Sequence, residues 1–366
     1  MEAKQILSQL TPYKQGKQTK EIQEEFGLDR IVKLASNENP YGYSAQVKQV
    51  LLQGLPEFNV YPDGYTADLR SALASKLEVE ESQLVFGSGT EEIIQMLCRT
   101  YLVPGSNVVA ATPTFGQYKH YSLIEGAEVN EVPVDADGYH DLNKMLDAID
   151  ENTRIVWLCS PNNPMGTVIP KESFKAFLNN CPKHVLIAFD EAYFEYVEPE
   201  ANIDVLSYLN SHNNLIVMRT FSKAYGLAGL RIGYGIADEA IIEKLNVVRG
   251  PFNTTSIAQQ AALIALSDQT FIADSYNKNK AVKESFKKFL DQIGWKYFHT
   301  ETNFILAETP ISGTEVFQYL LERGFIVRPG ELLGIPNTIR ISLGTDEDMN
   351  ELKRVLLAFH NEAIVK

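Results

Sequence analysis

The middle of this chain alternates short apolar runs with longer amphipathic segments, and this alternation limits the fold more than any other feature. An apolar run of about five residues predicts a buried strand, and an amphipathic segment of about ten predicts a helix that covers it. Repeated strand–helix units predict a mostly parallel sheet with helices on its faces, which is an α/β fold. The expected strands are Gln83–Phe86, Asn107–Ala111, Ile155–Cys159, Val185–Phe189, Leu215–Arg219 and Ile232–Ile236, and the expected helices include Glu91–Tyr101, Lys171–Asn179 and Asp238–Val248.

The last third of the chain predicts a second, smaller α+β unit. A helical pattern starts near Ser256, breaks at Ser267-Asp268 and runs to about Gln292, long enough to lead from one lobe into another. The segments expected after it are strands at Phe304–Ala307, Phe325–Arg328 and Thr338–Ser342, a helix at Thr314–Arg323 and a final helix from Asp346. A length of 366 residues also favours two lobes. We expect an N-terminal arm (1–37, a helix and an extended segment) that joins the small domain, a large domain (38–268) and a small C-terminal domain (269–366).

Composition and charge exclude several classes of protein. The formal net charge of −14 argues against a nucleic-acid surface, which needs clustered Lys and Arg, and against binding to anionic membranes. The three cysteines, Cys98, Cys159 and Cys181, form no CxxC pair, so we expect buried thiols in a reducing compartment and no metal site. The opening Met1-Glu-Ala-Lys-Gln has no apolar core of the signal-peptide kind, and no apolar run approaches transmembrane length. The expected location is the cytoplasm.

Polar residues follow five of the predicted strands. In an open parallel sheet, ligands bind beyond the carboxyl ends of the strands, so these residues are expected to face one crevice. The segments are Gly87-Ser-Gly-Thr-Glu91, Pro113-Thr-Phe-Gly-Gln-Tyr118, Ser160-Pro-Asn-Asn-Pro-Met-Gly166, Asp190-Glu-Ala-Tyr193 and Thr220-Phe-Ser-Lys223. Each could be ordinary turn chemistry by itself. Together they predict a single site.

Two of these segments suit a phosphorylated ligand with a basic ring nitrogen. The glycines of Gly87-Ser-Gly-Thr90 allow a ligand close to the backbone, and the N–H groups at the start of a helix attract phosphate; a plain capped turn is the alternative. The segment matches neither GxGxxG nor GxxxxGK[ST]. Asp190 ends an apolar run, and a buried carboxylate needs a cationic partner such as a protonated pyridine nitrogen. A helix-capping or core-paired Asp is the other interpretation.

Lys223 is the candidate nucleophile. A lysine on the surface is the default interpretation, but an amine in a partly desolvated crevice near cations loses its proton easily, as a Schiff-base nucleophile must. Thr220, Ser222 and Arg231 lie around it in the sequence. Their hydroxyls and guanidinium are suited to grip a phosphate.

Several motifs resemble those of a known family. Ser160-Pro-Asn-Asn-Pro-x-Gly, Asp190-Glu-Ala-Tyr and Ser222-Lys-x-x-Gly-Leu-x-x-x-Arg231 resemble the signature of fold-type-I, aspartate-aminotransferase-like enzymes, which use pyridoxal 5′-phosphate (PLP). Further segments look like the histidinol-phosphate aminotransferase family, and the resemblance covers essentially the whole chain. These segments are Leu34-Ala-Ser-Asn-Glu-Asn-Pro-Tyr-Gly42, Val60-Tyr-Pro-Asp-Gly64, Val248-Arg-Gly-Pro-Phe-Asn253 and Ile339-Arg-Ile-Ser-Leu-Gly344.

The resemblance implies a role for each matching residue. Lys223 would hold PLP as a Schiff base and move the proton between the substrate Cα and the cofactor. The remaining cofactor contacts implied are Asp190 to the pyridine nitrogen, Tyr193 and Asn163 to the phenolic oxygen, Phe115 on the ring, and Thr90, Glu91, Thr220, Ser222, Arg231 and Tyr61 from the other subunit of a homodimer around the phosphate. The substrate contacts implied are Tyr41, Asn163, Arg328 and Arg340. Met165 and Phe115 depart from the commoner Thr and Tyr, and the loss of a phenol at Phe115 bears on the substrate.

The reaction implied is transfer of an amino group between L-histidinol phosphate and 2-oxoglutarate, a ping-pong reaction of histidine biosynthesis that gives imidazole-acetol phosphate and L-glutamate. An aromatic-amino-acid (phenylalanine or tyrosine) aminotransferase shares the same cofactor residues and stays open. A PLP decarboxylase of a phosphorylated amino acid is a different reaction class on the same fold. A PLP-binding sensor in a regulator is a third possibility, which the absence of a basic helix-turn-helix segment disfavours.

Overall fold

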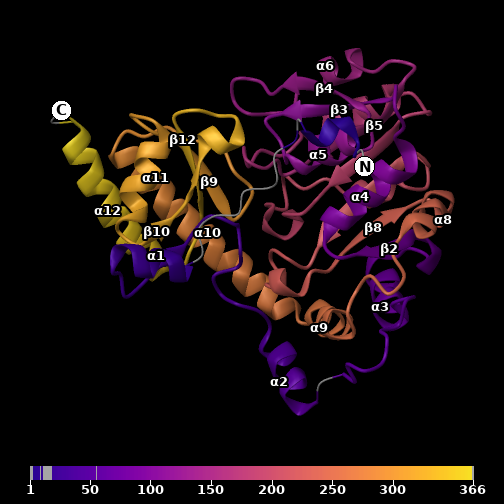
Figure 1. Ribbon diagram of the computed structural model, residues 1–366, viewed down its shortest axis with the longest axis horizontal. Coiled ribbons are helices and arrows are strands. Elements are labelled where there is room, and N and C mark those ends of the chain that lie inside the picture. The colour runs from indigo at the N-terminus through magenta and orange to yellow at the C-terminus, as the bar shows by residue number, and fades with distance from the viewer. Residues whose placement is uncertain (1–2, 9, 11–18, 55, 365–366) are drawn as a thin grey trace.

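The computed structural model describes residues 3–8, 10, 19–54 and 56–364, and within these residues the chain forms two lobes joined by one long helix (Figure 1). The larger lobe is built on a seven-stranded sheet. Its strands in spatial order are β2 (Leu84–Gly87), β8 (Gly233–Ala237), β7 (Leu215–Thr220), β6 (Leu186–Asp190), β5 (Thr153–Cys159), β3 (Asn107–Thr112) and β4 (Glu128–Pro133). Neighbouring strands pair in parallel except at β8, which is antiparallel to both β2 and β7. The predicted α/β class is confirmed.

Helices cover both faces of this sheet because alternate residues of each buried strand point to opposite sides. In β3, Val109 belongs to the core under α3 (Ala67–Leu77), α7 (Lys171–Asn180) and α9 (Ser256–Ser267). Its neighbour Val108 belongs to the core under α4 (Thr90–Tyr101), α5 (Gln117–Ile124) and α8 (Glu239–Val248). The remaining helical segments of this lobe are α2 (Ala45–Gln53), α6 (Leu142–Asp147) and the 3₁₀ turns Gln5–Ser8 (beside α5), Glu81–Gln83, Phe194–Tyr196, Val205–Tyr208 and Ala228–Leu230.

The smaller lobe combines the C-terminal part of the chain with residues 19–33 near its start. Its strands are β9 (Phe304–Glu308), β12 (Thr338–Ser342) and β11 (Arg328–Pro329), which form an antiparallel sheet, and β1 (Val32–Lys33), which pairs in parallel with β10 (Phe325–Ile326). Its helical segments are α10 (Gln269–Gln292), α11 (Gly313–Leu321), α12 (Asp346–Ile364), α1 (Thr19–Phe26) and the 3₁₀ turn Gly330–Leu333. Ile22 of α1 packs on Leu321 and Ile326, so α1 is part of this lobe's core. The start of the arm lies elsewhere, because Lys4 Nζ donates to Ile124 O at the end of α5 in the large lobe.

The expected strands and helices of both lobes are confirmed to within two residues at most ends, with one exception. The single strand expected at Phe325–Arg328 is divided into β10, which pairs with β1, and β11, which pairs with β12. The helix break expected at Ser267-Asp268 is also present, because Asp268 ends α9 and caps α10 by accepting a hydrogen bond from Phe271 N. The exact domain boundaries at 37/38 and 268/269 stay a prediction. The opening segment of the arm includes 1–2, 9 and 11–18, which lie outside the described residues. In the described part of the chain, no helix combines the length and apolar character needed to cross a bilayer.

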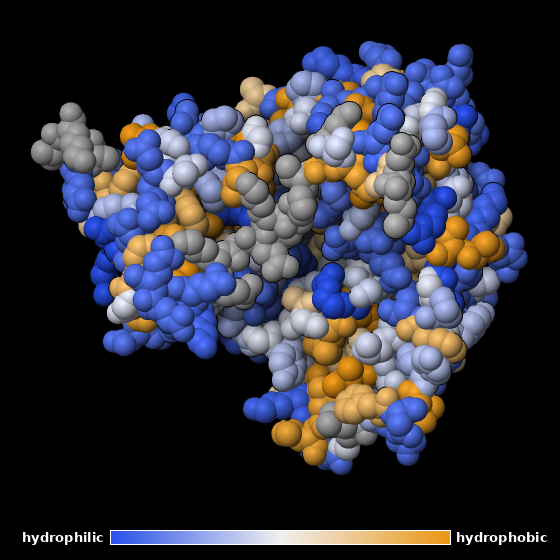
Figure 2. All heavy atoms as spheres, viewed as in Figure 1, coloured by the Kyte–Doolittle hydropathy of each residue, from blue (hydrophilic) through white to orange (hydrophobic). Residues whose placement is uncertain are grey.

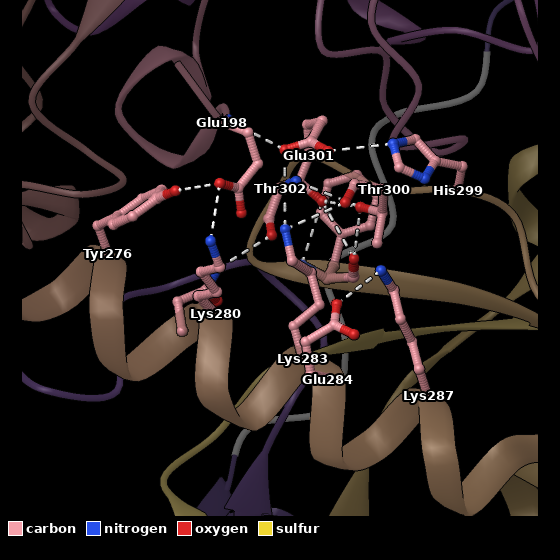
Figure 3. Close-up of polar contacts among 12 residues, drawn as sticks. Glu198, Tyr276, Lys280, Lys283, Glu284, Lys287, His299, Thr300, Glu301 and Thr302 are labelled. Atoms are coloured by element: carbon pink, nitrogen blue, oxygen red, sulfur yellow. Dashed lines mark hydrogen bonds and ion pairs between the residues drawn. The ribbon is translucent and has the colours of Figure 1, made fainter. Parts of the chain in front are cut away.

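A polar network fastens the two lobes together (Figure 3). The buried ammonium of Lys283 on α10 donates to Thr300 O at 3.1 Å and lies 3.9 Å from a Glu301 carboxylate oxygen. Glu198 of the large lobe joins this network. Its backbone N–H donates to the Glu301 carboxylate at 3.1 Å, and its own carboxylate accepts a hydrogen bond from Tyr276 Oη of α10 at 2.6 Å. Buried charges are tolerated only with such partners, so loop 299–303 is held in one position against both lobes.

Two adjacent leucines of α12 test how the small lobe's core is built. Leu356 is fully buried, whereas Leu357 is 44% exposed. We expect Leu356→Ala to lower the free energy of unfolding by about 3 kcal/mol, because it leaves a cavity, and Leu357→Ala by less than about 1 kcal/mol. Urea unfolding followed by circular dichroism measures both. Equal losses of unfolding free energy in the two variants would contradict the packing of α12 through the side that carries Leu356.

Candidate active site

A cavity of about 570 Å³ opens at the carboxyl ends of the large-lobe strands, where the small lobe's sheet meets them. Most residues that the sequence singled out line this one cavity: Thr90, Glu91, Phe115, Asn163, Asp190, Tyr193, Thr220, Ser222, Lys223, Arg231, Arg328 and Arg340. They come from both lobes and from segments as far apart as α4 and β12. The expectation that the five strand ends meet at one crevice is confirmed.

Asp190 is the last residue of β6 and is 3% exposed. One carboxylate oxygen accepts a hydrogen bond from Tyr118 Oη at 2.6 Å, and the other accepts from Ala192 N at 3.0 Å. Burial raises the pKa of this carboxyl to about 6, while the Tyr118 hydroxyl acts in the opposite direction. Tyr118 lies in a segment that the sequence placed at a strand end, but sequence reasoning gave its hydroxyl no role.

The Lys223 ammonium lies in the same cavity and donates to Ser36 O at 3.1 Å. Burial, together with the positive charges of Arg340 and Arg231, lowers the pKa of this amine to about 8. An amine with such a pKa is partly neutral near pH 7–8, as a nucleophile at carbon must be. Ser36 belongs to the motif around Asn37, which sequence reasoning used only as a family resemblance.

One end of the cavity is suited to an anion. Helix α4 begins at Thr90 after Gly89, which has no side chain to cap the first N–H groups. Gly89 has a φ of +77°, and a Cβ there would lie 2.7 Å from Arg231 Nη2, so the position needs glycine. Arg231 Nη1 lies 3.4 Å from Ser222 Oγ. A helix start, a hydroxyl and a guanidinium thus converge, which is the donor set that phosphate prefers.

The opposite side carries two arginines on paired strands. Arg328 of β11 and Arg340 of β12 are register partners, and both line the cavity. Arg340 Nη1 donates to Asn163 Oδ1 at 2.5 Å, and its Nη2 donates to Ala35 O at 2.7 Å. This small-lobe guanidinium therefore reaches across to the large-lobe turn that carries Asn163.

The turn that carries Asn163 is itself fixed by the inter-lobe network. Glu301 N donates to Gly166 O at 2.9 Å. Gly166 has a φ of +90°, and a Cβ at this position would lie 2.4 Å from Thr300 Oγ1. The turn rests directly on loop 299–303, so the position of Asn163 depends on how the lobes are joined.

Tyr193 completes the wall beside Lys223. Its hydroxyl accepts a hydrogen bond from Asn37 Nδ2 at 2.8 Å, and its ring meets Phe304 edge to face. Asn37 is buried with a φ of +56°, a conformation in which Asn is enriched. The hydrogen bond ties the N-terminal arm to the cavity wall, a link between distant segments that has no signal in sequence spacing.

Two predicted site residues lie outside the cavity lining. Tyr41 is partly buried, with Lys278 Nζ 5.3 Å from its ring centre. Tyr61 is 78% exposed and stacks on Phe252 with ring centres 4.7 Å apart. Their proposed contacts with substrate and with a neighbouring subunit stay predictions. Over the described ranges of the chain, no three His, Cys, Asp or Glu side chains gather as a metal site requires.

Comparison with known proteins agrees with this geometry. Residues 29–356 match the family model described as aminotransferase class I and II. The chain is 59% identical to histidinol-phosphate aminotransferase 2 of Oceanobacillus iheyensis, covering 99% of this chain and all of that protein. It is 48% identical to histidinol-phosphate aminotransferase of Bacillus subtilis, covering 97% of this chain and 99% of that one.

Solved structures show the same fold. The crystal structure of histidinol-phosphate aminotransferase from Sinorhizobium meliloti, in complex with pyridoxal-5′-phosphate, superposes with a TM-score of 0.89 at 25% identity, covering 98% of this chain and 97% of that one. With a family model over most of its length and relatives at about half identity, the chain belongs to the class I and II aminotransferase family.

Proposed function

We propose that this enzyme binds PLP and transfers an amino group between L-histidinol phosphate and 2-oxoglutarate, giving imidazole-acetol phosphate and L-glutamate. The names of its relatives support the reaction, and the PLP complex of the Sinorhizobium meliloti structure supports the cofactor. The observation that carries the substrate is the pair Arg328 and Arg340. Both guanidinium groups line the cavity that also holds Lys223.

The chain's own residues fit PLP. The buried Asp190 carboxylate is suited to a protonated pyridine nitrogen, because burial disfavours its ionised form and a bound cation would favour it. Thr90, Glu91, Thr220, Ser222 and Arg231 would hold the phosphate at the start of α4. Asn163 and Tyr193 would bind the phenolic oxygen, and Phe115 would pack on the ring. When bound, PLP supplies an electron sink for the bonds at the substrate Cα.

Lys223 would do the proton chemistry. Its amine would hold the cofactor between substrates and would carry the proton that leaves the substrate Cα. Burial and the neighbouring arginines keep its pKa near 8, so the neutral amine is available at the pH of the cell. Tyr193, held by Asn37, would fix the side from which the amine approaches.

Arg328 and Arg340 would serve both halves of a ping-pong cycle. Arg340, anchored by Asn163 and Ala35, would take the phosphate of one substrate or a carboxylate of the other. Arg328, its strand partner, would hold the same anion from a second side, and Tyr41 would close over the substrate. Two guanidinium groups suit both substrates, because glutamate carries two carboxylates and histidinol phosphate carries a dianionic phosphate.

Replacement of the amine tests the cofactor assignment. We expect Lys223→Ala to lower the transamination rate by on the order of 10³-fold or more, because the nucleophile and the proton carrier are lost together. Borohydride treatment of the wild-type holoenzyme should fix PLP on the peptide that contains Lys223, as read by mass spectrometry. Lys287→Ala on α10, outside the cavity, should keep both properties. Labelling at another lysine would contradict the assignment.

The substrate assignment is tested at Arg328. We expect Arg328→Ala to lower kcat/KM for L-histidinol phosphate by about 10- to 100-fold, the usual effect of losing a charged hydrogen bond to phosphate. Arg323→Ala serves as the matched control, because this arginine lies at the end of α11 over the Tyr319 ring and outside the cavity. Steady-state rates measure both variants.

The same assay separates the aromatic alternative. L-phenylalanine carries no phosphate, so its turnover should be poor in the wild type and little changed in Arg328→Ala. A fast wild-type reaction with L-phenylalanine and none with L-histidinol phosphate would assign the enzyme to the aromatic class. Release of carbon dioxide without a keto acid would indicate a decarboxylase instead.

We also propose that the enzyme is a homodimer in the cytoplasm. Large hydrophobic side chains are exposed around α2 and the loops beside it, and Figure 2 shows hydrophobic residues gathered low on this face over α2 and α9. The exposed set includes Leu52, Phe58, Val60, Tyr61, Tyr65 and Phe252. A patch of this kind marks an interface, and the stacked Tyr61 and Phe252 would then present Tyr61 to the neighbouring site. The buried free thiols support a reducing compartment.

Mixing two impaired variants tests the shared site. In the proposed dimer, each site combines Lys223 of one subunit with Tyr61 of the other. A heterodimer of a Lys223→Ala chain and a Tyr61→Ala chain should therefore contain one intact site and one site with both defects. Refolding the two chains together at equal amounts should restore activity in roughly a quarter of the sites. Each variant refolded alone is the control. Activity no higher than the average of the two parents, or an active monomer in sedimentation, would overturn the shared site.

A further inference from the structure

Among the described residues, Tyr118 makes the shorter of the two hydrogen bonds to the Asp190 carboxylate. Its hydroxyl donates to one carboxylate oxygen at 2.6 Å, while the Ala192 N–H occupies the other at 3.0 Å. Tyr118 is 1% exposed, so water does not compete for this hydrogen bond. A hydroxyl–carboxylate bond of this length in a buried site is among the stronger hydrogen bonds in proteins.

The Tyr118 ring cannot easily move away from the carboxylate. It stacks on Trp157 with ring centres 4.8 Å apart and an angle of 7° between the planes. Phe115 meets it edge to face at 5.5 Å. The backbone of α5 adds a further constraint, because Ser122 Oγ donates to Tyr118 O. The hydroxyl is thus fixed by aromatic packing before any ligand arrives.

We propose that Tyr118 is a positioning residue that holds the Asp190 carboxylate ionised and aimed at the pyridine nitrogen of the cofactor. This inference rests on the proposed PLP chemistry and deepens it, since Tyr118 itself does not line the cavity. A carboxylate with both oxygens hydrogen-bonded is held in one orientation, and Asp190 itself lines the cavity. Preorganised groups of this kind need no rearrangement when a positively charged ring nitrogen binds.

The groups around Asp190 decide whether removal of the Tyr118 hydroxyl raises or lowers the pKa of this carboxyl. Burial disfavours the carboxylate and raises its pKa, while the Tyr118 hydroxyl, the Ala192 N–H and the Lys223 ammonium lower it. The other ionisable groups that interact with Asp190 are Cys159 on β5, Glu191 beside it and Tyr193 after β6. Removal of the phenol hydroxyl takes away the strongest of the stabilising hydrogen bonds. The pKa of Asp190 should therefore rise, and its charged fraction near neutral pH should fall.

Tyr118→Phe tests this inference because it keeps the ring and removes the hydroxyl. The probe is pyridoxamine 5′-phosphate, which binds full-length protein stripped of cofactor without a covalent bond to Lys223. We expect its dissociation constant to rise about 10-fold at pH 7. In the wild type, affinity should fall as the pH drops through about 6, where Asp190 gains a proton. In the variant this fall should begin at a higher pH. Titration calorimetry from pH 5 to 8 measures both effects.

A second variant controls for the loss of any buried phenol hydrogen bond. Tyr276 donates to Glu198 at the same 2.6 Å, in the inter-lobe network of Figure 3 rather than beside the cavity. Tyr276→Phe should leave both the affinity and its pH dependence unchanged. Unfolding midpoints of the two variants report any general loss of stability, which would not move the pH at which affinity falls.

The double variant Tyr118→Phe, Asp190→Asn tests whether Tyr118 affects cofactor binding by acting on the Asp190 carboxylate. If Tyr118 acts through the carboxylate, its replacement should change the affinity of the Asp190→Asn protein less than twofold, against about 10-fold in the wild type. An unchanged pH dependence in Tyr118→Phe, or equal effects in both backgrounds, would overturn the positioning role. A wild-type protein that fails to bind the probe at all would instead overturn the proposed function.

Discussion

The burial of Asp190 at the end of β6 is the constraint on which the rest of the site depends. A parallel sheet covered on both faces removes its strand ends from water, so a carboxylate there is costly unless groups are arranged around it. Tyr118 and the Ala192 N–H meet part of that need by donating to its two oxygens, and Asp190 itself lines the cavity, where a cation can reach it. A ring nitrogen that carries a proton is such a cation. The same desolvation lowers the pKa of Lys223 to about 8, so one physical cause acts on both the carboxylate and the amine that works beside it.

The small lobe supplies positive charges that the strand ends of the large-lobe sheet do not provide. Parallel strand ends offer loops and helix starts, which suit the phosphate of a cofactor, but a second anion needs charges from the opposite side. The antiparallel pair β11–β12 places Arg328 and Arg340 side by side and turns them toward the large lobe. Arg340 is then bound to Asn163, whose turn rests on loop 299–303. The substrate side and the cofactor side are therefore mechanically joined, and the buried Lys283–Glu301 network fixes that junction.

Tertiary packing also explains where sequence reasoning had no signal. Strand β4 was not expected because it lies at the sheet edge and most of its side chains are partly or fully exposed, which leaves no buried apolar run to detect. Tyr118 was not given a role because its segment looks like an ordinary strand end, and only the packing of α5 against β5 brings its hydroxyl to Asp190. Asn37 and Ser36 reach Tyr193 and Lys223 from the N-terminal arm, across a separation in the chain that no periodicity encodes.

The α/β class, most strand positions, the two-lobe division and the cavity residues at five strand ends follow from the order of the amino acids. They do so because buried strands need continuous apolar runs and because ligands meet parallel sheets at their carboxyl edge. How the lobes meet, which arginine contacts Asn163 and which phenol supports Asp190 depend on the folded chain. Those contacts join residues tens to hundreds of positions apart, and their geometry depends on side-chain packing between elements, which is fixed only when the whole chain has folded.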